Sequence, residues 1–547
     1  MANPKQTVVR EASFLMAAQL VCSIIGLLYR SPLHMIMGSV GDGYYSFAYE
    51  WYTIILLISS YSIPTAISKV MSERVARHEY KNAQKVFRAS VFYVLGVGGL
   101  GCLVTFFGAP FFLSTQPDAV LALRILAPTI VFSGLLGCLR GYFQAQRSMF
   151  PTAVSRVVEQ IVNAVVSVLA AWLFTKSFAG GDEGLIAKYG AAGGTLGTGA
   201  GVLAGILFML FVCAVNMKLL SSRIRRDRHS KEETYGEVFK VIFLMVTPII
   251  FSTFIYNASA IVDQNIYNYC MLWRNVPAAE ASSQYGIFSY QFKPIINIPI
   301  AMASATSTAL IPAVAAAMAA GKREDAVARI DECMKLSSFL AIPAAVGLAV
   351  LSIPVIRILY PSANVDAAGL LLSVGAISVV FYSFSTVTNG VLQGLGHPSV
   401  PMKNAAIALL VNAAVAFALV GFTSMGVLGV LIATVVYAAT VTFLNALSMK
   451  RYLRYKHDLR RLILAPLRAA LAMGVVCGCI YWLPAFLLPG IFGRYLPSAL
   501  LTVAAVLAGI FTYVVLYTRT TGMTDEEMRK LPMGTKLLSL LRRLHIR

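Results

Sequence analysis

Long apolar stretches, separated by short polar segments, run through most of the chain. Each is long enough to cross a bilayer, which takes about 20 predominantly apolar residues in a helix. The pattern therefore predicts an all-α, polytopic membrane protein with fourteen transmembrane helices. The expected spans are 11–38, 45–70, 88–113, 119–143, 151–175, 192–219, 239–267, 285–317, 335–359, 367–393, 400–422, 425–449, 463–488 and 495–518.

Composition and charge agree with this class. Of the 547 residues, 58% are hydrophobic and 13% are charged, which excludes an ordinary soluble globular protein. If the N-terminus is cytoplasmic, most Lys and Arg residues fall in cytoplasmic segments, as in other membrane proteins. The outer side then holds only Arg124, Lys176, Lys188, Arg274, Arg357 and Arg494. We expect a multi-pass protein with both termini inside and no cleavable signal. The net charge of +21 is expected to attract anionic lipids rather than nucleic acid.

The chain repeats part of its own pattern. Gly141–Gln144 ends the fourth span, and Gly390–Gln393 ends the tenth, 249 residues later. Asn163 and Asn412 follow at the same offset. Because six spans return the chain to the same side, the two units are expected to form a parallel repeat about an axis along the membrane normal.

The repeat and the basic loops divide the chain into five expected parts. These are an N-terminal lobe (1–220), a cytoplasmic linker (221–238), a C-terminal lobe (239–450), two additional spans (451–518) and a cytoplasmic tail (519–547). The tail ends in an amphipathic run that is suited to the inner membrane surface.

The first expected span carries a polar stripe. Gln19, Ser23, Gly26, Arg30 and His34 recur at helical spacing and share one face. A guanidinium in hydrocarbon costs at least ~2.5–3.5 kcal/mol, so this face is expected to line a wet cavity. The alternative is that the Arg30 side chain extends to the outer headgroups.

Proline and several ionisable residues lie within other parts of the expected spans. Pro32 removes a backbone donor and is expected to bend the first span. The other ionisable candidates within the spans are Glu50, Glu159, Asp263 and Lys293. Ser289 and Asn297 share one helical face with Lys293. Arg140 and Arg156 flank the inner turn between the fourth and fifth spans.

These charges allow two interpretations. Arg30 and Lys293 come from the two lobes, and two cations at one cavity would suit a substrate with phosphate groups. The alternative is internal pairing, such as Arg30 with Glu50 or Lys293 with Asp263. Glu159 could relay a proton or ion, or it could pair with Arg140 or Arg156.

The pattern favours a transporter over an enzyme. The acids near the short outer loops, Asp42, Asp118, Asp182, Glu183, Glu280 and Asp366, are scattered. No large extramembrane domain, phosphate-binding loop or metal-like cysteine cluster is present in the sequence. We expect secondary transport, no catalytic residues, no metal and no cofactor.

Three long motifs resemble the MurJ-type lipid II flippases, and most of all the branch that includes the stage V sporulation protein B proteins. They begin at IIGLLYR, at LRGYFQAQRSMFPTAVSRVVEQIVN and at FKPIINIPIAMASATSTALIP. These flippases belong to the multidrug/oligosaccharidyl-lipid/polysaccharide exporter superfamily. The resemblance covers essentially the whole chain and implies two six-helix lobes plus two C-terminal helices.

The resemblance also implies a function. The implied function is the export of undecaprenyl-pyrophosphate-linked peptidoglycan precursor across the bacterial cytoplasmic membrane by alternating access. We expect the protein to be monomeric. Relatives move other lipid-linked polysaccharides or small drugs, which remain alternatives. The lipid tail would lie in a groove beside the last two spans, and coupling could use Na⁺, H⁺ or the membrane potential.

This resemblance and the pattern of polar residues within the spans together assign expected roles to individual residues. Arg30 matches a cavity arginine of the family, whereas Ile24 stands where many members have a second one. The expected substrate-binding set is Arg30, Lys293, Glu50, Glu159, Asn297, Gln19 and Ser23. The expected ion-binding set is Asp263, Asn412 and Thr434, although the acid of the eleventh span is missing. The expected inner gate consists of Arg140, Gln144 and Gln393.

Overall fold

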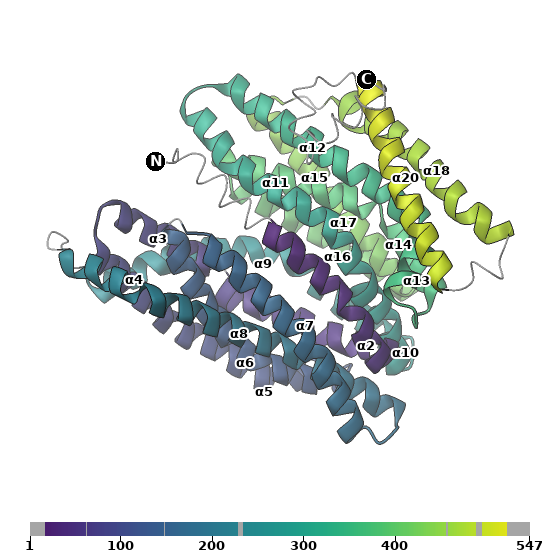
Figure 1. The fold of residues 1–547 in the computed structure, drawn as a ribbon, viewed down its shortest axis with the longest axis horizontal. Helices are drawn as coiled ribbons and strands as arrows, with labels where there is room; N and C mark the ends of the chain where they lie inside the picture. The colour runs from purple at the N-terminus through teal and green to yellow at the C-terminus, as the bar shows by residue number, and fades with distance from the viewer. Residues whose placement is uncertain are drawn as a thin grey trace. The chain divides into compact units, whose positions relative to one another are not determined.

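The structure is a computed structural model that describes residues 17–61, 63–146, 148–227, 233–455, 458–487 and 495–521. Within these ranges the regular structure is helical, and they contain no β-strand (Figure 1). The expected all-α class is therefore confirmed. The expected tail 519–547 lies almost entirely outside the described residues.

The helices follow one another with short connections. After a first helix, Ala17–Leu28, the helices as far as the middle of the chain are α2 (Arg30–Leu56), α3 (Ile63–Ala76), α4 (Tyr80–Tyr93), α5 (Gly99–Phe112), α6 (Val120–Ala145), α7 (Phe150–Phe178), α8 (Glu183–Arg226), α9 (Tyr235–Trp273) and α10 (Ala278–Gly286). Those that follow are α11 (Lys293–Ala319), α12 (Arg323–Val350), α13 (Ser352–Leu359), α14 (Val365–Gly375), α15 (Ser378–Gly394), α16 (Ser399–Phe422), α17 (Val427–Leu453), α18 (Ala465–Leu487) and α20 (Tyr495–Thr521).

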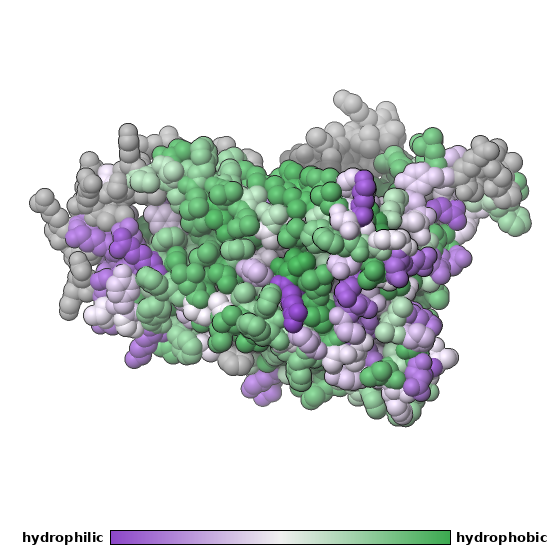
Figure 2. Space-filling model, turned by 90° about the horizontal axis from the view of Figure 1, so that it is seen from below, coloured by the Kyte–Doolittle hydropathy of each residue, from purple (hydrophilic) through white to green (hydrophobic). Residues whose placement is uncertain are grey.

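Many of these helices can cross a membrane. Among the described residues, nine are long and apolar enough to do so alone, and two bent helix pairs raise the number to eleven. All fourteen expected stretches contain helical residues, but the count of fourteen spans stays a prediction. Large hydrophobic side chains are exposed along these helices, as on α5 at Leu103, Phe107 and Phe111. Hydrophobic residues also cover much of the face shown in Figure 2, as expected for a surface in contact with lipid.

The chain folds into two compact units. The first unit comprises Met1–Tyr290 with Phe417–Val427, and the second comprises Gln291–Ala416 with Leu428–Arg547. Helices α9 and α10 thus pack within the first unit. The expected lobes, with their boundary at 221–238, stay a prediction about the repeat in the sequence.

A glycine stripe lets α8 approach α7 very closely within the first unit. A Cβ atom on Gly193 would lie 2.6 Å from the Ala170 backbone, and one on Gly201 would lie 2.5 Å from the Glu159 carbonyl oxygen. Between them, a Cβ on Gly197 would lie 2.1 Å from the Ser167 hydroxyl. Small residues four apart are the usual device for close helix packing in membranes, where lipid competes with apolar side chains. The spacing in GAAGGTLGTGAG carried this signal in the sequence.

In the second unit, the two C-terminal helices α18 and α20 pack on α12. Phe339 of α12 contacts the rings of Tyr513 and Tyr517 at centroid distances of 5.3 and 5.0 Å. The hydroxyls of Tyr481 and Ser498 lie 2.8 Å apart and join α18 to α20. The expected pair of additional spans therefore shares a hydrophobic core with α12 within this unit.

Two irregularities shape the beginning of the chain. The first helix and Arg30–Ser59 meet at an angle of 45°, as expected from Pro32, which cannot donate to the Leu28 carbonyl. Further along, Gly38 has φ 67° and ψ −179°, so α2 consists of two helical stretches joined at this glycine. A residue with a side chain would rarely adopt that backbone conformation.

Orientation in the membrane is a first testable prediction. In a background without the eight native cysteines, a cysteine at exposed Glu183 should react with a membrane-impermeant maleimide added to intact cells. A cysteine at exposed Lys322 should react only after the membrane is opened. The physical basis is the excess of Lys and Arg on the cytoplasmic side. The reverse labelling pattern would overturn the orientation.

The glycine stripe gives a second prediction. Gly197→Ala should lower the free energy of unfolding by about 1–3 kcal/mol, because its Cβ would overlap Ser167 on α7. Thermal melting of the purified protein in detergent measures the change. Gly99→Ala is the matched control, since its Cβ would meet nothing within 4 Å. Equal melting temperatures for the two variants would contradict a tight contact between α7 and α8.

Candidate binding site within the membrane

Arg30, the first residue of α2, is held by Tyr290 in the first unit. Its Nη1 donates to the Tyr290 carbonyl oxygen at 2.9 Å, and its Cζ lies 4.7 Å from the centre of the Tyr290 ring. The Tyr290 hydroxyl in turn donates to the Arg30 carbonyl oxygen at 3.2 Å. The guanidinium, in a half-buried residue, therefore has protein partners rather than only headgroups. Sequence reasoning did not identify Tyr290, which lies 260 residues away.

Glu50 lies on the second helical stretch of α2 and accepts two hydroxyl hydrogen bonds. Tyr285 donates to one carboxylate oxygen at 2.9 Å, and Ser289 donates to the other at 2.8 Å. Hydroxyl donors stabilise a carboxylate in a low-dielectric environment. Both donors come from α10 and the π-helical turn Ile287–Phe292, the segment that also supplies Tyr290.

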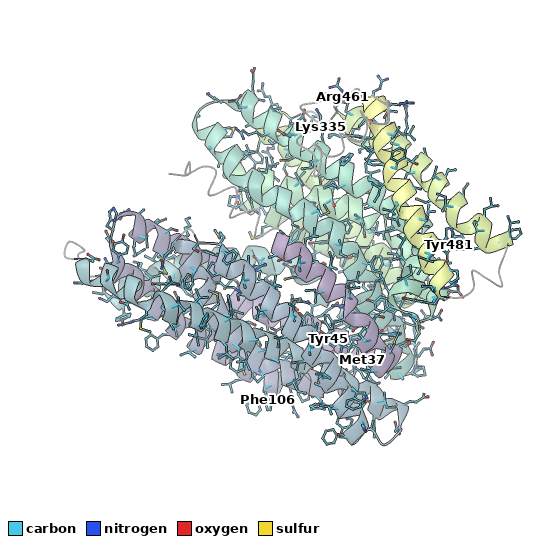
Figure 3. The ribbon with its side chains drawn as sticks, in the orientation of Figure 1. Met37, Tyr45, Phe106, Lys335, Arg461 and Tyr481 are labelled. Atoms are coloured by element: carbon cyan, nitrogen blue, oxygen red, sulfur yellow. The ribbon has the colours of Figure 1, made fainter. Side chains whose placement is uncertain are left out.

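Tyrosine rings surround this part of α2. Tyr45, which is labelled in Figure 3, contacts Tyr290 edge to face at a centroid distance of 5.4 Å. It also stacks on Tyr49 at 5.6 Å, and its hydroxyl lies 3.4 Å from that of Tyr29. These rings pack tightly, since Tyr45 and Tyr290 are almost completely buried. Arg30 therefore emerges from a rigid aromatic wall, and aromatic faces also favour cations.

His34, the last member of the polar stripe, does not join Arg30 at this wall. Its Nδ1 lies 2.7 Å from a carboxylate oxygen of Asp42, and both side chains are buried. The expectation that Asp42 belongs to an outer loop between spans was wrong, because residues 39–44 are helical. The break is confined to Gly38, whose backbone allows the turn within a single residue.

A second polar cluster lies where α6 meets α7. Arg140 donates to Glu159 at 2.6 Å and to the Ser155 hydroxyl at 2.9 Å. Arg156 donates to Gln19 at 2.5 Å and so links α7 to the first helix. Of the two interpretations of Glu159, the structure contains the pairing with Arg140. Local sequence signalled this pair, because α6 and α7 are joined by a short turn.

The other expected site residues are distributed over both units. Ser23 donates to the Gln19 carbonyl oxygen at 3.0 Å, a bond within the first helix. In the second unit, Lys293 is half-buried at the start of α11, and Asn297 is exposed one turn later. Gln144 is half-buried one residue before the end of α6 in the first unit, and Gln393 is exposed near the end of α15 in the second.

The expected ion-binding residues belong to three helices. Asp263 is buried on α9 in the first unit. In the second unit, Asn412 is buried on α16, and the Thr434 hydroxyl on α17 donates to the Val430 carbonyl oxygen at 3.0 Å. Their shared role stays a prediction. Within the described residues, no group of three His, Cys, Asp or Glu side chains is arranged to hold a metal.

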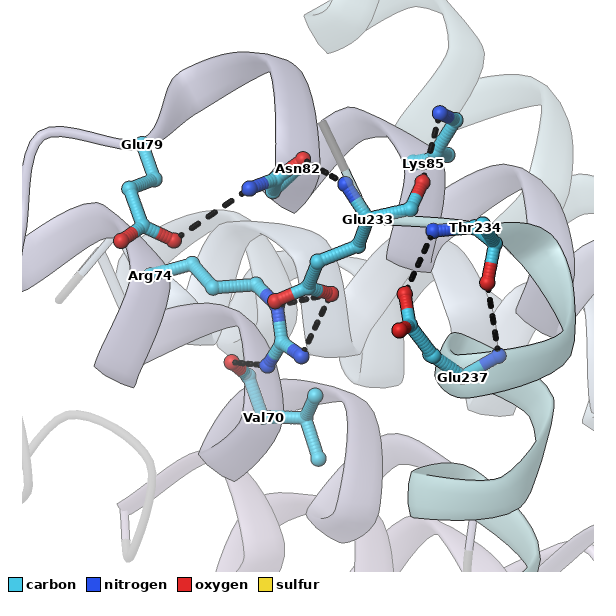
Figure 4. A network of polar contacts seen from close by, with 8 residues as sticks. All are labelled: Val70, Arg74, Glu79, Asn82, Lys85, Glu233, Thr234 and Glu237. Carbon is cyan, nitrogen blue, oxygen red and sulfur yellow. Dashed lines mark hydrogen bonds and ion pairs between the residues drawn. The ribbon is translucent and has the colours of Figure 1, made fainter. Parts of the chain in front are cut away.

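The end of the expected linker forms a polar network with α3 and α4 (Figure 4). Glu233 accepts from Arg74 at 2.7 and 3.0 Å, and Lys85 donates to the Glu233 carbonyl oxygen at 2.7 Å. Thr234 and Glu237 then form a capping box that begins α9. Basic residues between the second and third spans were expected mainly as a topology signal. The structure shows that two of them also fix the entry to α9.

Solved structures with this arrangement of helices are membrane transporters. "Lipid II flippase MurJ, inward closed conformation" superposes with a TM-score of 0.64 at 15% identity, covering 92% of this chain and 98% of that one. An outward-facing multidrug resistance MATE family transporter of the MOP superfamily has a TM-score of 0.60 at 14% identity, covering 84% and 98%. The fold is thus that of a polytopic membrane transporter.

Comparisons of sequence define the family. The polysaccharide biosynthesis protein model matches residues 8–318, more than half of the chain, and the MatE model matches residues 291–418. The chain belongs to the polysaccharide biosynthesis protein family, within the multidrug/oligosaccharidyl-lipid/polysaccharide exporter superfamily.

Two curated relatives come from Bacillus subtilis strain 168. Lipid II flippase MurJ is 24% identical over 506 residues, which are 89% of this chain and 91% of that protein. Stage V sporulation protein B is 27% identical over 480 residues, which are 87% of this chain and 89% of that protein.

The Arg140–Glu159 pair gives a third prediction. Glu159→Ala should lower the free energy of unfolding by about 1–3 kcal/mol, because it leaves a mostly buried guanidinium without its carboxylate. Chemical denaturation in detergent measures the loss. Arg461→Ala is the control, since it breaks a solvent-exposed pair with Asp458 and should cost less than about 0.5 kcal/mol. Similar losses for both variants would show that the pair on α6 and α7 has no special weight.

Proposed function

We propose that this protein is a flippase that exports an undecaprenyl-pyrophosphate-linked peptidoglycan precursor, lipid II, across the bacterial cytoplasmic membrane. The observation that carries the proposal is Arg30, a cation within a membrane-spanning segment that is held in place by Tyr290. A guanidinium suits phosphate oxygens because its donors match them in a planar fork. The relative named lipid II flippase MurJ, matched over most of its length, supports the choice of substrate.

The remaining parts of the proposal follow from the same class of transporter. The sequence repeat supports alternating access by two lobes about a central site. No catalytic residue is assigned, so the protein would move its substrate without changing it. Export toward the outer side requires that both termini be cytoplasmic. The coupling ion, Na⁺ or H⁺, would bind at residues such as Asp263. The protein would act as a monomer. Its partners would be the lipid-linked substrate and the anionic lipids of the membrane.

A second candidate is the export of another lipid-linked polysaccharide. The observation that favours it is the match to a general polysaccharide biosynthesis family, together with a similar identity to stage V sporulation protein B. Recognition of a pyrophosphate by Arg30 would be the same for both substrates, because the lipid-linked headgroup differs only beyond the phosphates. Multidrug export is less favoured, since the MatE model matches only residues 291–418.

The experiment that tests the function is complementation, and it is the fourth prediction. The wild-type protein should restore growth to a bacterium depleted of its lipid II flippase. Arg30→Ala should fail at equal abundance, and Arg30→Lys should restore growth only in part, because a point charge replaces the planar fork. Arg519→Ala, at the inner end of α20, is the control and should complement fully. Failure of the wild type, with normal membrane abundance, would favour another lipid-linked substrate.

A further inference from the structure

Pro294 cannot supply the N–H that a regular α-helix would offer to the carbonyl oxygen of Tyr290. In an α-helix this oxygen accepts from the N–H four residues later, but residue 294 is a proline and has no N–H. The preceding turn, Ile287–Phe292, is π-helical, and such turns are frequent at functional sites. The oxygen accepts a hydrogen bond from Arg30 Nη1 at 2.9 Å.

The helix that carries Arg30 is opened by a proline in the same way. Pro32 cannot donate to the carbonyl oxygen of Leu28, and the helix bends by 45° between Leu28 and Arg30. Arg30 is therefore the first residue of the helix that follows the bend. Its own carbonyl oxygen accepts from the Tyr290 hydroxyl at 3.2 Å. Arg30 and Tyr290 thus bind each other reciprocally, each through the carbonyl oxygen of the other.

The Tyr290 side chain is itself fixed. It has 0% exposure, and the ring of Tyr45 packs against it edge to face. The Arg30 guanidinium lies over the fixed ring, with Cζ 4.7 Å from its centre. An arginine has many rotamers, and binding is weakened when a ligand must order such a side chain. A buried ring and an immobile carbonyl oxygen remove most of that freedom before any ligand arrives.

We propose that Tyr290, through its carbonyl oxygen and its ring, is a positioning residue that orients the Arg30 guanidinium toward the pyrophosphate of a lipid-linked substrate. This rests on the proposed function. The ligand class is a phosphate ester or pyrophosphate, which requires the guanidinium plane to be aligned for paired hydrogen bonds. Tyr290 contacts Arg30 rather than the substrate, so it acts on affinity and not as a catalytic group.

The test uses the full chain in nanodiscs, with undecaprenyl pyrophosphate as the probe and its dissociation constant as the readout. Tyr290→Leu removes the ring face and the hydroxyl and should weaken binding about 10-fold. Tyr290→Phe keeps the ring and should weaken it only about 2–5-fold. Pro294→Ala adds an N–H that would compete with Arg30 for the Tyr290 carbonyl oxygen and should also weaken binding. Pro299→Ala on the same helix is the control and should leave the constant unchanged.

A double-mutant cycle shows whether Tyr290 acts through Arg30. In the Arg30→Ala background, Tyr290→Leu should have no further effect on binding. An equal loss in both backgrounds, or no loss in the wild-type background, would overturn the proposal. Inorganic pyrophosphate as a second probe separates recognition of free phosphate from recognition of the lipid headgroup.

Failure of the proposed function would give a different result. If the wild type does not bind the lipid pyrophosphate, the substrate assignment falls, and the Arg30–Tyr290 contact is then tested by thermal melting. Non-additive losses of melting temperature for Arg30→Ala and Tyr290→Leu would support positioning of Arg30 for another ligand. Additive losses would overturn the positioning role as well.

Discussion

A charged side chain within a membrane must be solvated by the protein, and this constraint organises the polar groups of the chain. Insertion of an unpartnered arginine costs at least ~2.5–3.5 kcal/mol. Arg30 is bound by the carbonyl oxygen and ring of Tyr290, Glu50 accepts from two hydroxyls, and Arg140 pairs with Glu159. These groups have partners on neighbouring helical segments, so their positions depend on how the helices pack.

Irregular backbone occurs where these partners are needed. Regular helices in a membrane satisfy their own carbonyl oxygens, and none is left over to bind a cation. The backbone is irregular near Arg30 and Tyr290, at the bend beside Pro32 and at the π-helical turn Ile287–Phe292, and here their side chains bind each other's carbonyl oxygens. Gly38 has a related role, because its positive φ allows the break within α2 that precedes the buried Asp42.

The two repeated parts of the sequence use equivalent positions differently. Arg140 and Ser155 of the first unit match Asn389 and Asn404 of the second at the 249-residue offset. In the first unit the arginine is part of an ion pair with a hydroxyl beside it. In the second unit the two asparagines bond to Asn445 at 2.7 and 2.8 Å in a neutral, buried network. At these matched positions polarity is thus retained in both units, whereas charge occurs only in the first.

The sequence by itself determined the membrane class, the helical positions and the residues worth examining. Hydropathy and proline effects are local, so the apolar helices and the bend near Pro32 could be predicted from neighbouring residues. The short turn between α6 and α7 likewise indicated Arg140 and Arg156 as possible partners of Glu159, and the structure selects Arg140. The family could also be recognised from long motifs, because each motif is a continuous stretch of the sequence.

Tertiary structure decided which side chains complete each site. Tyr290 lies 260 residues from Arg30, and Tyr285 lies 235 residues from Glu50, so no local pattern could pair them. The burial of Asp42 beside His34 likewise depended on a one-residue break at Gly38 rather than on hydropathy. Hydropathy places a helix in the membrane, but the partner of a polar side chain depends on which helices meet and on how each is rotated.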